Sequence, residues 1–217
     1  MPAMDITRIE NGAFRENAWL AVCGGEAALV DPGGEPERLA AAVRASGAEL
    51  REVLLTHGHV DHISALGEVL AAFPAATVRI SGEDEAWCFT PLNEMPPYRV
   101  PRRPEAGRVS RVRNGDSICL GGTVFSVLAT PGHSPGSVCY FAREGGANAR
   151  GILFSGDTLF ARTIGRTDLP GGDDAAMERS LALLAALPPQ TLVLPGHGPE
   201  TTISTELATN PFLHRHG

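Results

Sequence analysis

The stretch from Thr56 to His62, which we term the metal loop, holds four potential metal ligands within six residues. Three are imidazoles and one is a carboxylate: His57, His59, Asp61 and His62. Neutral imidazole and carboxylate groups suit Zn²⁺, Fe²⁺ and Mn²⁺. Ordinary surface residues rarely reach this density in a chain with seven histidines, so the stretch predicts a metal site. Because His57 and His59 are two residues apart, they converge only where the backbone is extended or turning.

Three later stretches share one pattern, in which an apolar strand runs into a glycine-containing turn that carries a polar side chain. These side chains are His133, Asp157 and His197. Glycine lets the backbone bend tightly and come close to a bound ion. Together with the metal loop they make seven candidate ligands, too many for one tetrahedral zinc ion. Seven ligands fit two metal ions that share one bridging carboxylate.

Apolar runs on either side of the metal loop predict the elements that carry it. A buried strand over residues 51–55 comes before the loop, and an amphipathic helix over residues 62–73 follows it. The first half also predicts turns at 11–12 and 24–25, strands near residues 6–9, 19–22, 28–30 and 77–80, and a helix over 36–46. The loop is therefore expected between a strand and a helix, which is a rigid support for a reactive site.

The second half of the chain is again rich in predicted strands. They are expected over residues 108–112, 117–120, 123–128, 137–141, 151–154 and 191–194, with hairpin turns at 114–116 and 121–122. A helix is expected to begin at Asp173 or Asp174 and to run to about Ala186. This order of elements predicts an α/β protein with two β-rich halves packed face to face and helices outside.

Two segments leave alternatives open. Asp31 follows the third strand, where its carboxylate could support the metal loop or simply cap a turn. Residues 81–106 contain prolines that interrupt any helix, and three arginines gather there. We expect a long surface excursion, either a solvated loop, which is the favoured interpretation, or a segment beside the site.

The overall composition excludes several classes of protein. A hydrophobic content of 43% suffices for a core, and a formal charge of −7 without a basic run argues against a nucleic-acid partner. There is no 18-residue apolar stretch and no basic, apolar leader, so we expect a cytoplasmic protein without a membrane partner. The four cysteines are expected to be reduced and mostly buried: Cys23, Cys88, Cys119 and Cys139.

The motifs together resemble those of the metallo-β-lactamase superfamily. They are the His-x-His-x-Asp-His cluster, Pro-Gly-His at 131–133, Gly-Asp at 156–157 and Pro-Gly-His-Gly at 195–198. The resemblance implies a four-layer αββα sandwich with the site at one edge between the sheets. The run 155–173 is similar to the single-domain, glyoxalase II-like branch, as is 209–213. That branch implies one metallo-β-lactamase-like domain over residues 1–217, without a C-terminal helical substrate domain.

The resemblance also implies a role for each candidate ligand. The first of one or two divalent ions, Zn or Fe with Mn also possible, would be held by His57, His59 and His133. The second would be held by Asp61, His62 and His197, with Asp157 as the bridge. Asp61 would also orient the nucleophile and shuttle its proton. A β-lactamase of this superfamily has no aspartate at the position of Asp157, so this residue argues against antibiotic hydrolysis.

The activity implied is hydrolysis of a small-molecule thioester such as S-D-lactoylglutathione, through a metal-bound hydroxide that attacks the thioester carbonyl. Two-domain glyoxalase II enzymes have a lysine where Arg166 stands and a tyrosine where Asp168 stands. Arg166 is therefore either a substrate-binding residue for the thiol carrier or the partner of Asp168 in an ion pair. The identity of the thiol and the oligomeric state stay open.

A persulfide dioxygenase is the main alternative to the hydrolase. That related branch would use His57, His133 and Asp157 as a mono-iron site and would act on glutathione persulfide. The run 168–173 is similar to the hydrolase branch and favours hydrolysis. A third class, a metal-binding adaptor without catalytic activity, is disfavoured because all seven candidate ligands are present.

Overall fold

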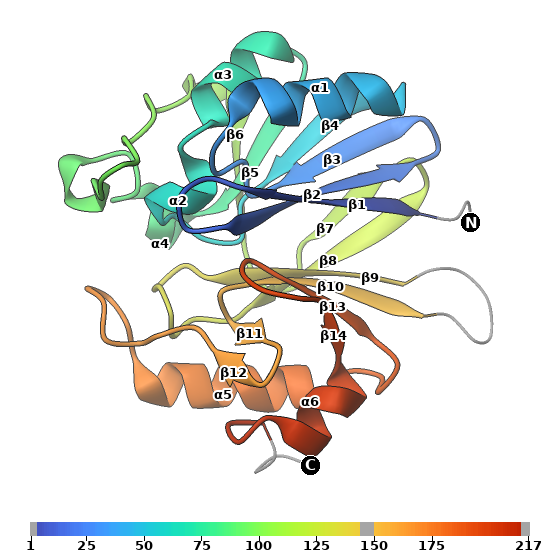
Figure 1. Ribbon diagram of the computed structural model, residues 1–217, viewed down its shortest axis with the longest axis vertical. Coiled ribbons are helices and arrows are strands. Elements are labelled where there is room, and N and C mark those ends of the chain that lie inside the picture. The colour runs from blue at the N-terminus through green and yellow to red at the C-terminus, as the bar shows by residue number, and fades with distance from the viewer. Residues whose placement is uncertain (1–3, 144–149, 214–217) are drawn as a thin grey trace.

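Two six-stranded β-sheets face each other in the computed structural model, which describes residues 4–143 and 150–213 (Figure 1). The first sheet contains, in spatial order, β1 (Asp5–Asn11), β2 (Glu16–Cys23), β3 (Glu26–Val30), β4 (Glu49–Leu54), β5 (Thr77–Ser81) and β6 (Val109–Val112). The second contains, in spatial order, β14 (Thr201–Thr202), β13 (Leu192–Pro195), β10 (Gly151–Gly156), β9 (Val138–Arg143), β8 (Thr123–Ala129) and β7 (Ser117–Leu120). A short ribbon pairs β11 (Leu159–Phe160) with β12 (Thr163–Ile164).

Helices cover the outer face of each sheet (Figure 1). The α-helices of the described residues are α1 (Pro36–Ser46), α2 (Val60–Ile63), α3 (Leu66–Ala72), α4 (Gly82–Glu85), α5 (Asp174–Ala185) and α6 (Ile203–Thr209). The helices α1 and α3 lie on the first sheet, and α5 and α6 lie on the second. The αββα sandwich predicted from the sequence is therefore confirmed. No helix in the described part of the chain is both long and apolar enough to cross a membrane.

Successive side chains of a strand point to opposite faces of its sheet, and this alternation builds the layers. In β3, Ala27 and Leu29 pack toward the helices, whereas Ala28 and Val30 pack toward the second sheet. Both faces of the strand are buried, which explains its uninterrupted apolar sequence. The core between the two sheets includes fully buried aromatic residues such as Phe154, each of which contributes about 2 kcal/mol by leaving water.

Local signals set the helix ends where the sequence predicts them. Helix α1 has the predicted bounds, because Pro36 suits the first turn and Gly47 adopts a left-handed φ of 69° just after the last turn. Helix α5 begins after Asp173, whose side chain accepts a hydrogen bond from the Ala176 N–H at 2.9 Å.

The helix predicted over residues 62–73 is wrong as one element, because the structure divides it into α2 and α3. The break lies at Ala65, whose N–H donates to the carbonyls of Pro32 and Gly33 at 3.0 and 2.9 Å instead of continuing a helix. Glycine is required at position 33, since a Cβ there would lie 1.9 Å from the carbonyl oxygen of Asp61. The metal loop is thus held against the turn that follows β3.

The hairpin predicted at residues 114–116 is also wrong. The turn exists, but it carries the chain from β6 in the first sheet to β7 in the second. The Gly115 N–H donates to Val127 O at 2.9 Å, and the Asn114 side chain accepts from the Ala129 N–H at 2.9 Å. Hydrogen bonds to residues of β8 therefore hold this turn in place. The other predicted turns, at 11–12, 24–25 and 121–122, join antiparallel neighbours.

The favoured interpretation of residues 81–106 as a solvated loop holds only in part: residues 94–105 form no helix or strand and are mostly exposed, whereas residues 81–93 are folded. The segment contains α4 and a 3₁₀ turn over Pro91–Asn93, and it buries Asp84 and Cys88 completely. It lies beside the metal loop, which is the alternative considered above. The elements β11, β12, β14 and α6 were not predicted, because each is short. His214 and His216 lie outside the described residues.

Candidate metal centre

The seven candidate ligands gather at one edge of the sandwich. Four follow β4 and occupy the metal loop and α2, and the other three follow β8, β10 and β13 of the second sheet. Glycines make this convergence possible. A Cβ at Gly156 would lie 2.3 Å from Thr56 Oγ1, and one at Gly196 would lie 2.3 Å from Asp157 Oδ1. Any larger residue at these two positions would separate the turns.

The first group of ligand atoms belongs to His57, His59 and His133, which can lie around one ion. His59 Nδ1 is 2.8 Å from His133 Nε2. His133 Nδ1 donates to the Arg166 carbonyl at 2.7 Å, so in the neutral ring Nε2 carries the lone pair. His57 Nε2 is buried without a hydrogen-bond partner among the described residues. We term this group the His59 side.

The second group of ligand atoms belongs to Asp61, His62 and His197 and is termed the His197 side. His197 Nε2 lies 3.3 Å from His62 Nε2 and 3.4 Å from Asp61 Oδ2. Asp157 stands between the two sides. Its Oδ1 is 3.4 Å from His62 Nε2, and its Oδ2 is 3.5 Å from His133 Nε2.

Asp31 lies behind the metal loop, at the end of β3. Its Oδ1 accepts from the Thr56 N–H at 2.8 Å, and its Oδ2 accepts from the Thr56 hydroxyl at 2.6 Å and lies 3.1 Å from His62 Nδ1. Because the one hydroxyl hydrogen of Thr56 goes to Asp31, the Thr56 oxygen accepts from His57 Nδ1–H at 3.0 Å. These bonds leave Nε2 of both histidines free to face the centre. The contacts match the supporting role considered for Asp31.

Burial and charge shift the pKa values of His57 and His59 on one side, and of His62 on the other, in opposite directions. Burial lowers the pKa of His57 well below its usual value and lowers the pKa of His59 to about 4. Burial also disfavours a charge on His62, but the carboxylates of Asp157 and Asp61 outweigh it and hold the pKa of His62 well above its usual value. Burial raises the pKa of the two carboxyls, whereas His62 lowers it, and the net shift is downward for both.

Three buried polar residues shape the centre without any clear sequence signal. Asp84 accepts from the N–H groups of Gly58 and Gly136, both at 2.8 Å, so it ties the metal loop to the turn that carries His133. Asn17 anchors the turn that carries His197, because its Nδ2 donates to Pro195 O at 3.0 Å and Gly198 O at 2.9 Å. Glu16, whose backbone bridges to that of His197, is fully buried, and burial raises its pKa well above its usual value. The one sequence signal for Glu16 and Asn17 is that two polar residues stand next to each other at the start of the otherwise apolar strand β2.

The side chain of Arg166 does not reach the ligand cluster. Its Nε lies 2.6 Å from Asp168 Oδ1 in an ion pair whose side chains are 62% and 68% exposed. The structure therefore shows the ion pair that the sequence left open. Arg166 contributes to the site through its backbone carbonyl, which orients His133.

Two cavities adjoin the centre, one on each side. One of about 320 Å³ begins at His59 and is walled by the 81–106 segment and the 169–171 turn. The other, of about 550 Å³, begins at His197 and is lined by Arg8, Glu10 and Arg15 among others. The two cavities therefore differ in chemistry although they flank one cluster.

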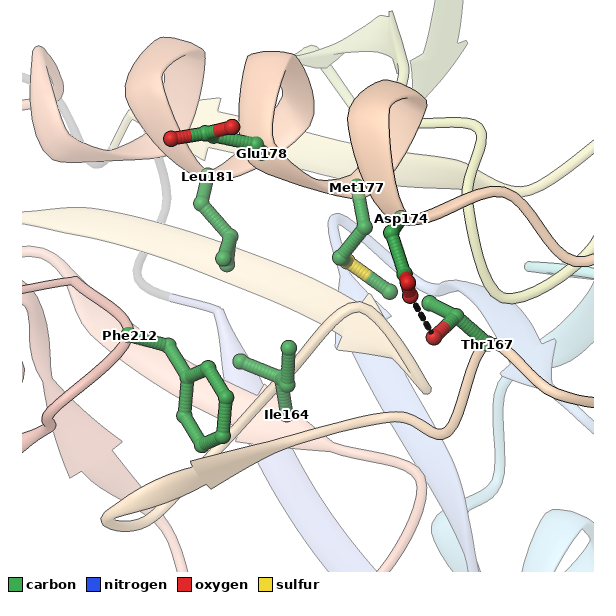
Figure 2. Close-up of a pocket in the computed structure, with 7 residues that line it drawn as sticks. All are labelled: Ile164, Thr167, Asp174, Met177, Glu178, Leu181 and Phe212. Carbon is green, nitrogen blue, oxygen red and sulfur yellow. Dashed lines mark hydrogen bonds between the residues drawn. The ribbon is translucent and has the colours of Figure 1, made fainter.

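A third cavity, of about 350 Å³, is separate from the centre (Figure 2). Figure 2 shows Ile164 and Phe212 on one side of it and Met177 of α5 on the other. The Thr167 hydroxyl donates to the Asp174 carboxylate at its edge. None of the seven candidate ligands lines it.

The sequence is similar to proteins of one family along most of its length. Residues 11–197 match a family model described as the metallo-beta-lactamase superfamily. The chain is 35% identical over 212 residues to the probable metallo-hydrolase YqgX of Bacillus subtilis (strain 168), covering 95% of this chain and 96% of that protein. It is 34% identical over 215 residues to the hydroxyacylglutathione hydrolase GloC of Haemophilus influenzae, covering 97% and 99%.

Two solved structures share the fold over nearly their whole length. The BLEG-1 B3 metallo-beta-lactamase superimposes with a TM-score of 0.86 at 37% identity, covering 96% of this chain and 99% of that one. TTHA1623 in a di-iron-bound form superimposes with a TM-score of 0.78 at 37% identity, covering 95% and 100%.

Proposed function

We propose that this chain, which belongs to the metallo-beta-lactamase superfamily, is a metal-dependent hydrolase of thioesters such as S-D-lactoylglutathione. The observation that carries the proposal is the position of Asp157 between two groups of ligand atoms, with oxygen atoms 3.4 Å from His62 Nε2 and 3.5 Å from His133 Nε2. The thioester class is supported by the 34% identity to a hydroxyacylglutathione hydrolase over nearly the full length of both chains.

The donor set fits two divalent ions. The buried Nε2 of His57 has no hydrogen-bond partner among the described residues, as expected of an atom that faces an ion. His57, His59 and His133 would hold one ion, and Asp61, His62 and His197 would hold a second, with Asp157 placed to contribute to both. Imidazole and carboxylate ligands suit Zn, Fe and Mn.

Divalent ions held by such ligands lower the pKa of water to about 7 and polarise a carbonyl oxygen. The residues of the chain then govern geometry and proton movement. Asp61 has a lowered pKa and is therefore ionised at neutral pH, so its Oδ2 can orient the attacking water and accept its proton. Water adds to the thioester carbonyl and the carbon–sulfur bond breaks. A thiolate is a fair leaving group, so the release of acid and thiol needs no strong acid from the protein.

The test combines metal analysis with a pair of assays on protein purified without added metal. We expect divalent metal in the protein and release of free thiol from S-D-lactoylglutathione. The rival persulfide dioxygenase would instead consume oxygen with glutathione persulfide and leave the thioester intact. Oxygen consumption without thiol release would overturn the hydrolase assignment.

β-Lactam hydrolysis is a second candidate, because the BLEG-1 B3 metallo-beta-lactamase has the same fold at 37% identity. A chromogenic cephalosporin assayed beside the thioester separates the two. We expect kcat/KM for the thioester to exceed that for the cephalosporin. The reverse order would make β-lactam hydrolysis the function.

A further inference from the structure

The cavity on the His59 side has an apolar wall. Its lining includes Trp87, Leu92, Met95, Pro135, Leu169 and Pro170. Leu92 is 89% exposed and Met95 is 41% exposed, although both stand next to a cluster of metal ligands. Large apolar side chains left in water beside a reactive site are a feature of ligand-binding surfaces. A volume of about 320 Å³ suits part of a small molecule.

Hydrogen bonds connect this wall to the metal loop. Asn93 Nδ2 donates to Gly58 O at 2.7 Å and to Cys88 O at 2.8 Å. The Trp87 indole N–H donates to Asp84 Oδ1 at 3.2 Å, and the ring lies 5.5 Å from the ring of His59. The wall is therefore formed before any ligand arrives, and its position relative to His59 is fixed.

The charges around this cavity disfavour an anion. Among the described residues that line it, none is Lys or Arg, and Glu94 supplies a carboxylate. The nearby Arg166 is engaged by Asp168 in a bidentate ion pair. Along the wall formed by Trp87, Leu92 and Met95, away from an ion at His59, a carboxylate of a ligand would lose its water without gaining a cationic side chain.

We propose that the cavity on the His59 side binds an uncharged apolar group attached to the thioester. The inference rests on the proposed function and adds the substrate class. The apolar group could belong to the acyl part or to the thiol part, since either side of the carbonyl could point toward Trp87 and Leu92. The chemistry is the same in both cases, and the substrates described below distinguish them.

The kinetic test uses matched thioesters of an uncharged thiol. In the acyl arm, phenylacetyl and lactoyl esters of N-acetylcysteamine are compared. In the thiol arm, lactoyl esters of benzyl mercaptan and N-acetylcysteamine are compared. We expect the aromatic member of one arm to have a kcat/KM at least about tenfold higher, which is the discrimination that an apolar pocket supplies. Equal values in both arms would overturn the proposal.

A pair of variants assigns the preference to this cavity. Leu92→Glu should reduce the preference for the aromatic ester about tenfold, and turnover of the lactoyl ester of N-acetylcysteamine is measured beside it. Leu183→Glu, at an exposed leucine of α5, is the matched control and should alter neither. A preference that survives Leu92→Glu, or that both variants reduce equally, contradicts the assignment.

A binding measurement tests the cavity without catalysis. The probe is S-benzyl-N-acetylcysteamine, a thioether that cannot be hydrolysed, and Trp87 reports binding by its fluorescence. The other tryptophan, Trp19, is buried between the sheets. We expect a saturable change that Trp87→Phe removes while calorimetry still detects binding. The matched thioether with a carboxylate in place of the phenyl ring should bind at least about tenfold more weakly, and equal binding would overturn the proposal.

The two proposals fail in different ways. If the metal-loaded protein leaves every thioester intact, the proposed function is wrong, and the thioether titration still decides the chemistry of the cavity. If thioesters are cleaved and the benzyl thioether shows no saturable binding, the hydrolase stands and the cavity proposal is wrong.

Discussion

The His59 side and the His197 side of the candidate centre are built on different electrostatics. On the His59 side, burial keeps the pKa of His59 at about 4, and the adjoining cavity is apolar. On the His197 side, Asp61 and Asp157 hold the pKa of His62 above its usual value, and the adjoining cavity is lined by Arg8 and Arg15. The two ion positions therefore differ in their electrostatic environment, and the two ends of a substrate would contact different surfaces.

The largest effect is expected where the two sides meet, at Asp157. Asp157→Ala removes the carboxylate between them, so the ion on the His197 side should be lost and turnover should fall by more than about 100-fold. Metal per chain is measured by plasma mass spectrometry beside thiol release, with Asp174→Ala, at the separate cavity of Figure 2, as the control. Full metal content with full turnover in Asp157→Ala would contradict the bridging position.

Metal affinity should depend on pH differently on the two sides. His62 keeps a proton above its usual pKa of 6.5, so an ion on the His197 side must displace that proton, whereas His59 is already neutral above about pH 4. Over the range in which His62 is protonated, affinity for the second ion should rise by up to about tenfold per pH unit, with a smaller change for the first. Competition with a chelator at pH 6 and pH 7 measures the affinities for both ions. If the two affinities change equally with pH, the two sides do not differ in this respect.

The same shifts give opposite signs for the stability of the metal-free protein. His59 has a lowered pKa, so it destabilises the fold as the pH falls from 6.5 to about 4, because the unfolded chain binds more protons there. His62 has a raised pKa, so its contribution is present in full below 6.5 and is lost as the pH rises through its folded value. Urea unfolding of chelator-treated protein across this pH range measures the free energy of unfolding, to which both histidines contribute.

The fourth effect should disturb the His59 side alone. Four donors converge on the carboxylate of Asp84: the N–H groups of Gly58 and Gly136, the Ser134 hydroxyl and the Trp87 indole. In Asp84→Asn, the side-chain NH2 group replaces one carboxylate oxygen and cannot accept the hydrogen bonds of two of these donors. The free energy of unfolding should therefore fall by about 1–3 kcal/mol. Affinity for the first ion should fall, with little change at the second. Thermal unfolding and chelator competition test this, and equal weakening of both ions would mean that the two sides are not independent.

The ligand cluster could be predicted from the sequence because its signal is local. Four ligands lie in the metal loop, and each of the other three follows an apolar strand and a glycine-containing turn. The layers could be predicted for a related reason, since alternation and apolar runs are properties of single strands. The bounds of α1 and the capping of α5 by Asp173 likewise depend on neighbours in the chain.

The supporting residues could not be predicted, because their roles come from distant contacts. Asp84 is a lone aspartate in a proline-containing region, and the N–H groups of Gly58 and Gly136, from which it accepts hydrogen bonds, lie 26 and 52 residues away. The break at Ala65 depends on carbonyls that follow β3, and the turn at 114–116 is fixed by strand β8. Local pattern therefore identifies the ligands, and tertiary contacts decide what holds them.

The smallest expected effect concerns the cavity on the His197 side. Arg8 and Arg15 both pair with Glu10 at 2.9 Å, so two guanidinium groups face one carboxylate and leave a formal positive charge. Because the Arg15 side chain is 78% exposed, Arg15→Gln should raise KM only about two- to fivefold, and only for thioesters whose thiol carries a carboxylate. Arg51→Gln, at another exposed ion pair, is the matched control. The measurement compares lactoyl esters of glutathione and of N-acetylcysteamine at low and high salt, since screening should abolish the difference. An equal change in KM for both esters would mean that Arg15 acts on the fold of this turn and not on the charge of the substrate.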